Sequence, residues 1–216
     1  MNNSVGNTGR LLWAGLRALL LLTVVCGVLY PLAVTGVAQG FFRDRANGSE
    51  IRSEGKVVGS SLIGQTYLTK DGKPDLHWFQ PRPSNGLGTN SVNTQYKLIL
   101  SGATNLAGSS KELVEQVKDA RAAVVADNST ATYKVKAADI PADAVTSSAS
   151  GLDPQISPAY AELQIHRVAE KNHLSVERVH QLVDDHTDGR ILGFMGEPGV
   201  NVLELNVALR QLTDKS

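Results

Sequence analysis

Apolar residues are concentrated in one uninterrupted run near the start of the chain. The 21 residues from Ala18 to Ala38 carry no charge and most are aliphatic, and the flanking charges are Arg17 and Arg43. An α-helix of that length measures about 31 Å, which matches the roughly 30 Å hydrocarbon layer of a membrane. The run therefore predicts a transmembrane helix over 18–38.

A cleaved signal peptide is the competing interpretation of this run. Gly36-Val37-Ala38 has the small-x-small pattern of a cleavage site before Gln39. The apolar region of a signal peptide usually spans about 7–15 residues, which is shorter than this one. We therefore favour a retained anchor.

The charges that flank the run predict its orientation. Arg10 and Arg17 precede it with no acid nearby, whereas the segment 43–45 that follows is mixed in charge. Because positive residues stay on the cytoplasmic side, we expect residues 1–17 to form a cytoplasmic tail. Residues 39–216 then form a periplasmic domain of a single-pass protein of the inner membrane.

Glycine and proline inside the run predict contact with a neighbouring helix. Pro31 removes one helix hydrogen bond and should kink the axis, and Gly27 exposes backbone. Gly36 and Gly40 have the G-x-x-x-G spacing that allows two helices to approach closely. The alternative is that both residue types are simply more frequent in membrane helices, and the sequence leaves it open.

The exported part begins with strand patterns. Short apolar segments at 57–68 and 76–80 are separated by the turn-like residues 70–74, which predicts strands and a hairpin-like connection. The proline-rich segment 81–86 excludes regular structure.

Helical patterns dominate the later part of the chain. A helix is expected over 111–126, and Ser157 and Ser175 are the N-caps expected for two more. Residues 197–212 fit both strand alternation and a helix, and Asn201 with Glu204 three residues later favours the helix. The predicted fold class is α/β (α+β), with one mixed domain whose short strands come early and whose helices come late.

Composition and charge exclude several classes of function. The 216 residues are 42% apolar and 19% charged, with 21 basic and 21 acidic side chains and no basic stripe. We therefore expect no nucleic-acid partner. Cys26 is the single cysteine, so neither a disulfide within the chain nor a cysteine-based zinc site can form.

Tests for catalytic or metal-binding motifs are negative. His166, His173 and His180 are seven residues apart, too far along a helix to share one ion, and 184–189 lacks the ligands of a calcium loop. The glycines at 102 and 108 are not followed by the lysine of a phosphate-binding loop. We expect no catalytic, cofactor-binding or metal-binding residues, although a Ser/His/Asp site assembled from distant segments stays open.

The segment SGLDPQISP, residues 150–158, predicts a rigid corner. Asp153 can accept backbone N–H groups in an Asx turn, and Pro154 fixes the next φ angle. Leu152 and Ile156 should anchor this turn to the core. The opposing interpretation, Asp153 as a general base, lacks a visible partner residue.

The chain also resembles a known family, the C subunit of the Kdp-type potassium-transporting ATPase, over nearly all residues after 10. The resemblance rests on many segments that recur in order: Tyr30-Pro31, 46–49, 59–65, Arg82-Pro83-Ser84, 101–102, Asn105-Leu106, 141–143, Gly151-Leu152-Asp153-Pro154 with 156–158, 193–194, 196–198 and 200–206. Gln155, where a histidine is usual, and the segments 103–104 and 107–108 depart from the family pattern.

The resemblance implies a non-catalytic subunit of a potassium uptake complex. Its expected partners are a channel-like potassium-binding subunit, a P-type ATPase subunit and membrane lipid, and ATP, Mg and K are used by the complex rather than bound by this chain. The family has also been assigned a role in raising the ATP affinity of the pump subunit. The candidate contact residues are Gly27, Tyr30, Pro31, Gly36, Gly40, Asn105, Gly151, Leu152, Asp153 and Pro154.

Two other classes of protein compete with this interpretation. One is a membrane-anchored envelope hydrolase, and the other is a secreted binding domain whose anchor is removed. An enzyme should turn over substrate alone, and a secreted domain should begin at Gln39 in its mature form.

Overall fold

The computed structural model describes residues 3–84 and 101–214. The chain divides into two compact units, one that ends at Ser49 and one that begins at Glu50. We describe each unit separately.

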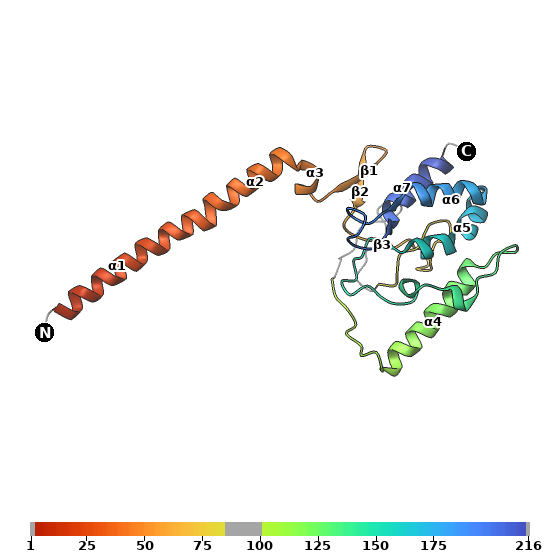
Figure 1. Ribbon diagram of the computed structural model, residues 1–216, viewed down its shortest axis with the longest axis horizontal. Coiled ribbons are helices and arrows are strands. Elements are labelled where there is room, and N and C mark those ends of the chain that lie inside the picture. Colours follow the sequence, from red (N-terminus) through yellow and green to blue (C-terminus); the bar gives the residue numbers. More distant parts are fainter. Residues whose placement is uncertain (1–2, 85–100, 215–216) are drawn as a thin grey trace. The chain divides into compact units, whose positions relative to one another are not determined.

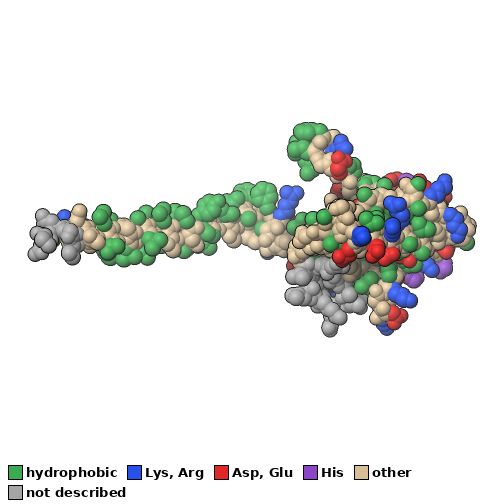
Figure 2. Space-filling model, turned by 90° about the horizontal axis from the view of Figure 1, so that it is seen from below, with side chains coloured by type: hydrophobic (Ala, Val, Ile, Leu, Met, Phe, Trp, Pro, Cys, Tyr) green, Lys and Arg blue, Asp and Glu red, His purple; other side chains and the backbone are tan. Residues whose placement is uncertain are grey.

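The first unit is a long helix. It comprises α1 (Asn3–Val24), a π-helical turn (Val25–Leu29) and α2 (Tyr30–Phe41), followed by the short helix α3 (Arg43–Ala46). Its segment Gly6–Phe41 is the one helix in the described residues that is long and apolar enough to cross a membrane. Hydrophobic side chains line this rod in Figure 2, whereas most charged side chains in that view belong to the second unit.

Pro31 alters the hydrogen bonding of this helix rather than bending it sharply. The Tyr30 N–H donates to the Val25 carbonyl, five residues back, so the turn before Pro31 is π-helical. A π turn is rare and occurs mostly as a single turn inside an α-helix. The ribbon continues through Pro31 without a sharp kink (Figure 1), so the bend expected there is replaced by a local widening.

The second unit begins with an antiparallel hairpin, β1 (Glu50–Ser53) and β2 (Lys56–Ser60). Glu54 and Gly55 between the strands both have positive φ, 52° and 78°, which is the backbone of a tight two-residue turn. Val58 of β2 packs with Leu203 and Val207 of α7 (Val202–Thr213), so the hairpin is joined to the C-terminal helix through a small apolar cluster.

The second sheet has three short antiparallel strands. The strands β3 (Gln155–Ile156), β5 (Gly199–Asn201) and β4 (Thr187–Asp188) lie in the order β3-β5-β4. All three residues of β5 are buried because it is the central strand. Gln155 pairs with Asn201, so the predicted corner at 150–158 continues into this sheet.

Four helices complete the second unit. They are α4 (Lys111–Asn128), α5 (Pro158–Asn172), α6 (Val176–Asp185) and α7, and two 3₁₀ turns lie at Ala137–Asp139 and Ala142–Ala144. α5 packs on α6 and also on α4, and α6 packs on α7. The main core combines their inner faces with β5 and with Tyr67 and Phe79 from the early part of the unit.

The helix starts follow the predicted caps. The Ser157 and Ser175 hydroxyls accept the N–H groups of residues 160 and 178, and Asn201 Oδ1 accepts from two N–H groups of α7. These observations confirm the three predicted starts. Ser110 occupies the N-cap position of α4, but its side chain makes no capping hydrogen bond.

The early strand predictions are partly confirmed. Leu68 and Pro74 form an antiparallel bridge and Thr69 N–H donates to Lys73 at 2.7 Å, so the hairpin-like connection exists. Residues 76–80, expected as a strand, belong to neither sheet. At the C-terminal end, the favoured helix is confirmed as α7, which begins at Val202, and the residues just before it, Gly199–Asn201, form strand β5.

Candidate functional site: a corner tied to three other segments

The corner at 150–158 is formed by its own local chemistry. Asp153 Oδ1 accepts the Gln155 N–H at 3.1 Å, which is the predicted Asx turn. Gly151 has a φ of 69°, a conformation that glycine adopts at little cost. Ile156 is buried in the main core, as expected.

Leu152 differs from its prediction. Its side chain is partly exposed and lies outside the main cluster of core residues, so it does not anchor the corner through apolar contact. Its backbone does so instead, because the Leu152 carbonyl accepts the Gly64 N–H at 3.0 Å. The Leu152 N–H donates to Ser150 Oγ at 3.1 Å.

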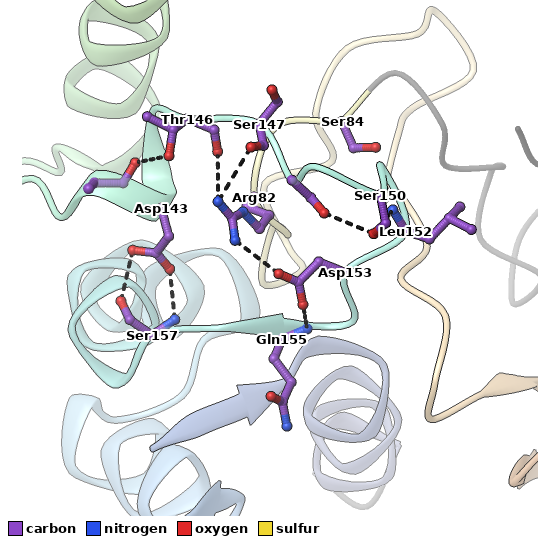
Figure 3. A network of polar contacts seen from close by, with 12 residues as sticks. Arg82, Ser84, Asp143, Thr146, Ser147, Ser150, Leu152, Asp153, Gln155 and Ser157 are labelled. Carbon is purple, nitrogen blue, oxygen red and sulfur yellow. Dashed lines mark hydrogen bonds and ion pairs between the residues drawn. The ribbon is translucent and has the colours of Figure 1, made fainter. Parts of the chain in front are cut away.

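Arg82 supplies the partner that the sequence did not reveal for Asp153. Its Nη1 lies 2.9 Å from Asp153 Oδ2, and its Nη2 donates to the Thr146 and Ser147 carbonyls at 3.4 Å (Figure 3). The two charged side chains are 23% and 32% exposed, so water screens the pair only in part. The Arg82 Nε is buried and has no hydrogen-bond partner among the described residues.

The residues that follow Arg82 hold the other side of the corner. Ser84 Oγ donates to the Gly151 carbonyl, and the Pro83 carbonyl accepts the Ser148 N–H at 3.3 Å. Side chains and backbone of 82–84 therefore lie along residues 146–153, as Figure 3 shows for Arg82, Ser147 and Asp153. This pairing spans about seventy residues of sequence.

Further segments end at the same corner. The Ser150 carbonyl accepts the Gly102 N–H at 2.9 Å and the Ser101 hydroxyl at 3.0 Å. At the other end, the Pro154 carbonyl accepts the Val202 N–H at 3.0 Å, at the start of α7. The corner thus joins Gly64, residues 82–84, residues 101–102 and the start of the C-terminal helix. We therefore call residues 150–158 a structural junction.

Asp143 fixes the point where the corner becomes helix α5. Its carboxylate accepts the Ser157 N–H at 2.7 Å and the Ser157 hydroxyl at 2.9 Å (Figure 3). The same hydroxyl accepts the Tyr160 N–H at 3.1 Å, as an N-cap does. The carboxylate near the helix start also interacts favourably with the positive end of the helix dipole.

A second polar network surrounds the buried Arg167. This side chain is 2% exposed, yet no carboxylate contacts it in the described residues. Its guanidinium donates instead to Asn128 Oδ1, Gln164 Oε1 and the carbonyls of Leu76 and Trp78. Burial lowers the pKa of Arg167 to about 10, which leaves it cationic at neutral pH.

Amide side chains replace a partner strand for residues 76–80. Asn206 exchanges two hydrogen bonds of 2.9 Å with the backbone of Phe79. Gln164 does the same for Gln80, at 2.7 and 3.1 Å. The backbone groups of Phe79 and Gln80 are satisfied in this way without a neighbouring strand. The residues before them do not form the expected strand, because Leu76 and His77 lie in a turn.

A cavity of about 230 Å³ lies beside this network, lined by α4, α5 and residues 66–84. Its walls are mainly apolar, with Asp127, Tyr160 and Arg167 as the ionisable groups on α4 and α5. Burial raises the pKa of the Asp127 carboxyl and raises the pKa of Tyr160 to about 12. These groups include no nucleophile paired with a base of the kind that hydrolysis requires.

The three evenly spaced histidines lie apart on the two neighbouring helices. His166 is on α5 and stacks on Tyr133, His173 ends α5 in a left-handed conformation, and His180 is on α6. The predicted break between the helices is therefore confirmed. In residues 3–84 and 101–214, no group of three His, Cys, Asp or Glu side chains could hold a metal ion.

The candidate contact residues fall into two groups. Gly27, Tyr30, Pro31, Gly36 and Gly40 lie on the long helix, where none is buried. A Cβ at Gly36 or Gly40 would meet no atom within 4 Å in the described part of the chain, so both glycines leave an open surface.

The remaining candidates lie in the second unit. Residues 151–154 form the corner itself. Asn105 is exposed and has a φ of 52°, and within residues 3–84 and 101–214 no hydrogen bond ties it to the corner. Three residues at the corner, Arg82, Ser84 and Asp143, were not predicted from local sequence patterns. Only the family resemblance includes their segments, because no local pattern pairs an arginine with an aspartate so far along the chain.

Together, these features describe a chain with one N-terminal helix that is long and apolar enough to cross a membrane, and an α/β unit organised around a structural junction. The model of the family "K+-transporting ATPase, c chain" matches residues 12–211. A potassium-transporting ATPase KdpC subunit of Streptomyces avermitilis is 71% identical over 100% of both chains. The KdpC subunit of Streptomyces coelicolor is 65% identical over 98% of this chain and 97% of its own.

More distant relatives have the same description. The KdpC subunit of Kineococcus radiotolerans is 44% identical over 97% of this chain and 98% of its own. The chain therefore belongs to the KdpC family, the c chain of potassium-transporting ATPases.

Proposed function

We propose that this chain is a non-catalytic accessory subunit that assembles or stabilises the channel-like and P-type ATPase subunits of a high-affinity potassium uptake complex. Membership of the KdpC family supports a place in such a complex. The finer role is inferred from the hydrogen bonds and the ion pair within the second unit. Residues 150–158 are joined by hydrogen bonds to several distant segments, and Arg82 and Asp153 form an ion pair at this junction.

The observation that carries the proposal is the pairing of Arg82 with Asp153. A general base must be free to accept a proton from substrate. Asp153 instead has one oxygen on the Arg82 guanidinium and the other on a backbone N–H. Asp153, which the opposing interpretation would make a general base, is thus engaged in holding the fold.

The topology we propose follows from the long helix. Residues 1–17 form a cytoplasmic tail, 18–38 cross the inner membrane, and 39–216 form the periplasmic domain. In the described residues 18–38, the apolar side chains face outward and the two glycines Gly36 and Gly40 leave an open surface, which suits contact with lipid and with a neighbouring helix. ATP, Mg and K are used by the partner subunits, and any effect on ATP affinity passes through the span.

Detergent co-purification tests this function. An affinity tag on the ATPase subunit should retain this chain in a fixed ratio to the two larger subunits. The chain purified by itself should hydrolyse neither ATP nor ester and phosphate test substrates. Recovery of the chain only as a free monomer would contradict the proposal, as would substrate turnover that is lost when Asp153 is changed to Asn without loss of fold.

A further inference from the structure

The cavity beside α4 and α5 has the size for a small organic molecule. Its volume is about 230 Å³, and an apolar cavity of about 150 Å³ is already large enough to bind benzene. Small side chains leave this space, because Ala120 and Ala123 of α4 and Ala144 line it. Ala123 is also exposed, so the cavity opens to the surface and a ligand can enter.

Two arginines bring hydrogen-bond donors without acceptors to this cavity. Arg82 and Arg167 both line it, and the buried Arg82 Nε has no partner in residues 3–84 and 101–214. A guanidinium has one more N–H group than the four hydrogen bonds that Arg167 makes, so one N–H of its Nη2 is left without an acceptor in the described part of the chain. Buried donors of this kind are rare in native proteins and point to a bound ion, water or ligand.

The charge of these donors favours an anionic oxygen as the acceptor. Arg167 is 2% exposed and has no carboxylate among its hydrogen-bond partners, which are amide and carbonyl oxygens. Arg82 contacts Asp153 through Nη1, which leaves its Nε for another acceptor. An N–H group on a cation binds a carboxylate more strongly than a neutral oxygen, and the planar guanidinium matches a carboxylate in shape.

Asp127 limits the charge of the ligand. It lies on α4, lines the same cavity and is not a hydrogen-bond partner of Arg167. When it is ionised, its carboxylate repels a bound anion, so one negative charge is tolerated better than two. A single carboxylate therefore suits the cavity better than a phosphate group, which carries more negative charge at neutral pH.

The remaining walls favour an apolar body for the ligand. The side chains that line the cavity between its polar groups include Leu68, Pro74, Leu76, Pro81 and Val124. Apolar surface buried against these side chains stabilises a bound molecule, whereas a bare inorganic ion leaves them uncovered. The ligand that matches both kinds of wall is an amphiphile with one anionic end.

We propose that this cavity binds a small apolar monocarboxylate. Its carboxylate accepts the N–H groups of Arg82 and Arg167 that have no other acceptor, and its apolar body lies against α4 and residues 68–81. The proposal concerns this chain by itself and does not depend on the proposed function. The competing occupant is water alone, and the two occupants make opposite predictions for binding.

A titration with 3-(4-fluorophenyl)propionate tests the proposal on the full chain in lipid nanodiscs. This probe has one carboxylate and a compact apolar body somewhat larger than benzene. After subtraction of the signal from nanodiscs without the chain, its ¹⁹F resonance should shift and broaden saturably, with a Kd of about 1 mM or below. The neutral amide of the same shape, 3-(4-fluorophenyl)propanamide, should bind about tenfold or more weakly.

Four variants locate the binding site. Ala120→Leu fills the cavity and should abolish binding, whereas the control Ala122→Leu adds the same side chain at an exposed position of α4 and should bind as wild type. Arg82→Lys keeps a cation for Asp153 but lacks the Nε donor, and should weaken binding about tenfold. Asp127→Asn removes the repulsion and should tighten binding at least about threefold, which a purely structural role of Asp127 does not predict.

Thermal unfolding midpoints show which variants are folded, and Arg82→Lys with the amide probe decides the question if Ala120→Leu does not fold. Saturable binding that needs the carboxylate, is lost or weakened in Ala120→Leu and Arg82→Lys, and is retained in Ala122→Leu would support the proposal. The absence of saturable binding at about 10 mM probe would overturn it in favour of water. Equal affinity for the acid and the amide, or affinity unchanged by Ala120→Leu and Arg82→Lys, would overturn it as well.

Discussion

The ion pair between Arg82 and Asp153 provides the most quantitative test of the junction. Asp153→Asn removes the negative charge but keeps an oxygen that can accept the Gln155 N–H, so the Asx turn is preserved. Asp153→Ala removes both interactions. The difference between the two variants therefore separates the ion pair from the turn.

The expected loss can be estimated from the geometry. A hydrogen bond to a charged group contributes about 1.5–3 kcal/mol, and partial exposure of both side chains reduces this contribution. At 23% and 32% exposure, we expect Asp153→Asn to lower the free energy of unfolding by about 1–2 kcal/mol. Asp153→Ala should cost about 1 kcal/mol more, because the Asx-turn hydrogen bond is also lost.

Urea unfolding of the full chain in detergent measures this loss. A Trp13→Phe background leaves Trp78, which packs against the core, as the fluorescent reporter. With a denaturant slope of about 2 kcal/mol per M, the midpoint of Asp153→Asn should fall by about 0.5–1 M. Glu50→Gln is the control: its ion pair with Arg52 is 3.0 Å long but mostly exposed, so its loss should cost below about 0.5 kcal/mol. Equal midpoints for the two variants would refute the reasoning.

Three further substitutions probe other parts of the second unit. Arg167→Leu removes four hydrogen bonds, including those to Asn128 Oδ1 and the Leu76 carbonyl, and should cost about 3–5 kcal/mol by the same urea assay, or prevent folding. Gly59→Ala places a Cβ against the Gln65 amide and 2.7 Å from Leu203 Cδ2, so overpacking should cost about 1–3 kcal/mol. Asp127→Asn should stabilise the fold at neutral pH, because burial raises the pKa of the Asp127 carboxyl above 3.8. The protonated carboxyl contributes fully to the free energy of unfolding below pH 3.8, and this contribution is lost as pH rises through the folded-state pKa. Unfolding midpoints from pH 3 to 8 should therefore converge at low pH for wild type and Asp127→Asn, and a wild type that is the more stable at pH 7 would contradict this assignment.

Local chemistry explains which parts of the fold could be predicted. The caps Ser157, Ser175 and Asn201 act on N–H groups two or three residues away, so their effect can be read from a short stretch of sequence. The Asx turn at Asp153 is local in the same sense. These predictions agree with the structure because no distant residue competes for the same groups.

Distant partners explain what could not be predicted. Residues 76–80 have a strand pattern, but the amide side chains of Gln164 and Asn206 take the place of a neighbouring strand. The pairing of Arg82 with Asp153 spans 71 positions, and neither residue lies in a motif that points to the other. The exposure of Ile191, Leu192 and Phe194 was likewise hidden, because their segment has the composition of a core segment.

The most direct test of the central claim compares three preparations. Potassium-stimulated ATP hydrolysis is measured for the channel-like and ATPase subunits purified with this chain and without it, and for this chain alone. We predict activity only when all are present, with no turnover by the isolated chain. Full activity and intact assembly of the other subunits in its absence would contradict the account.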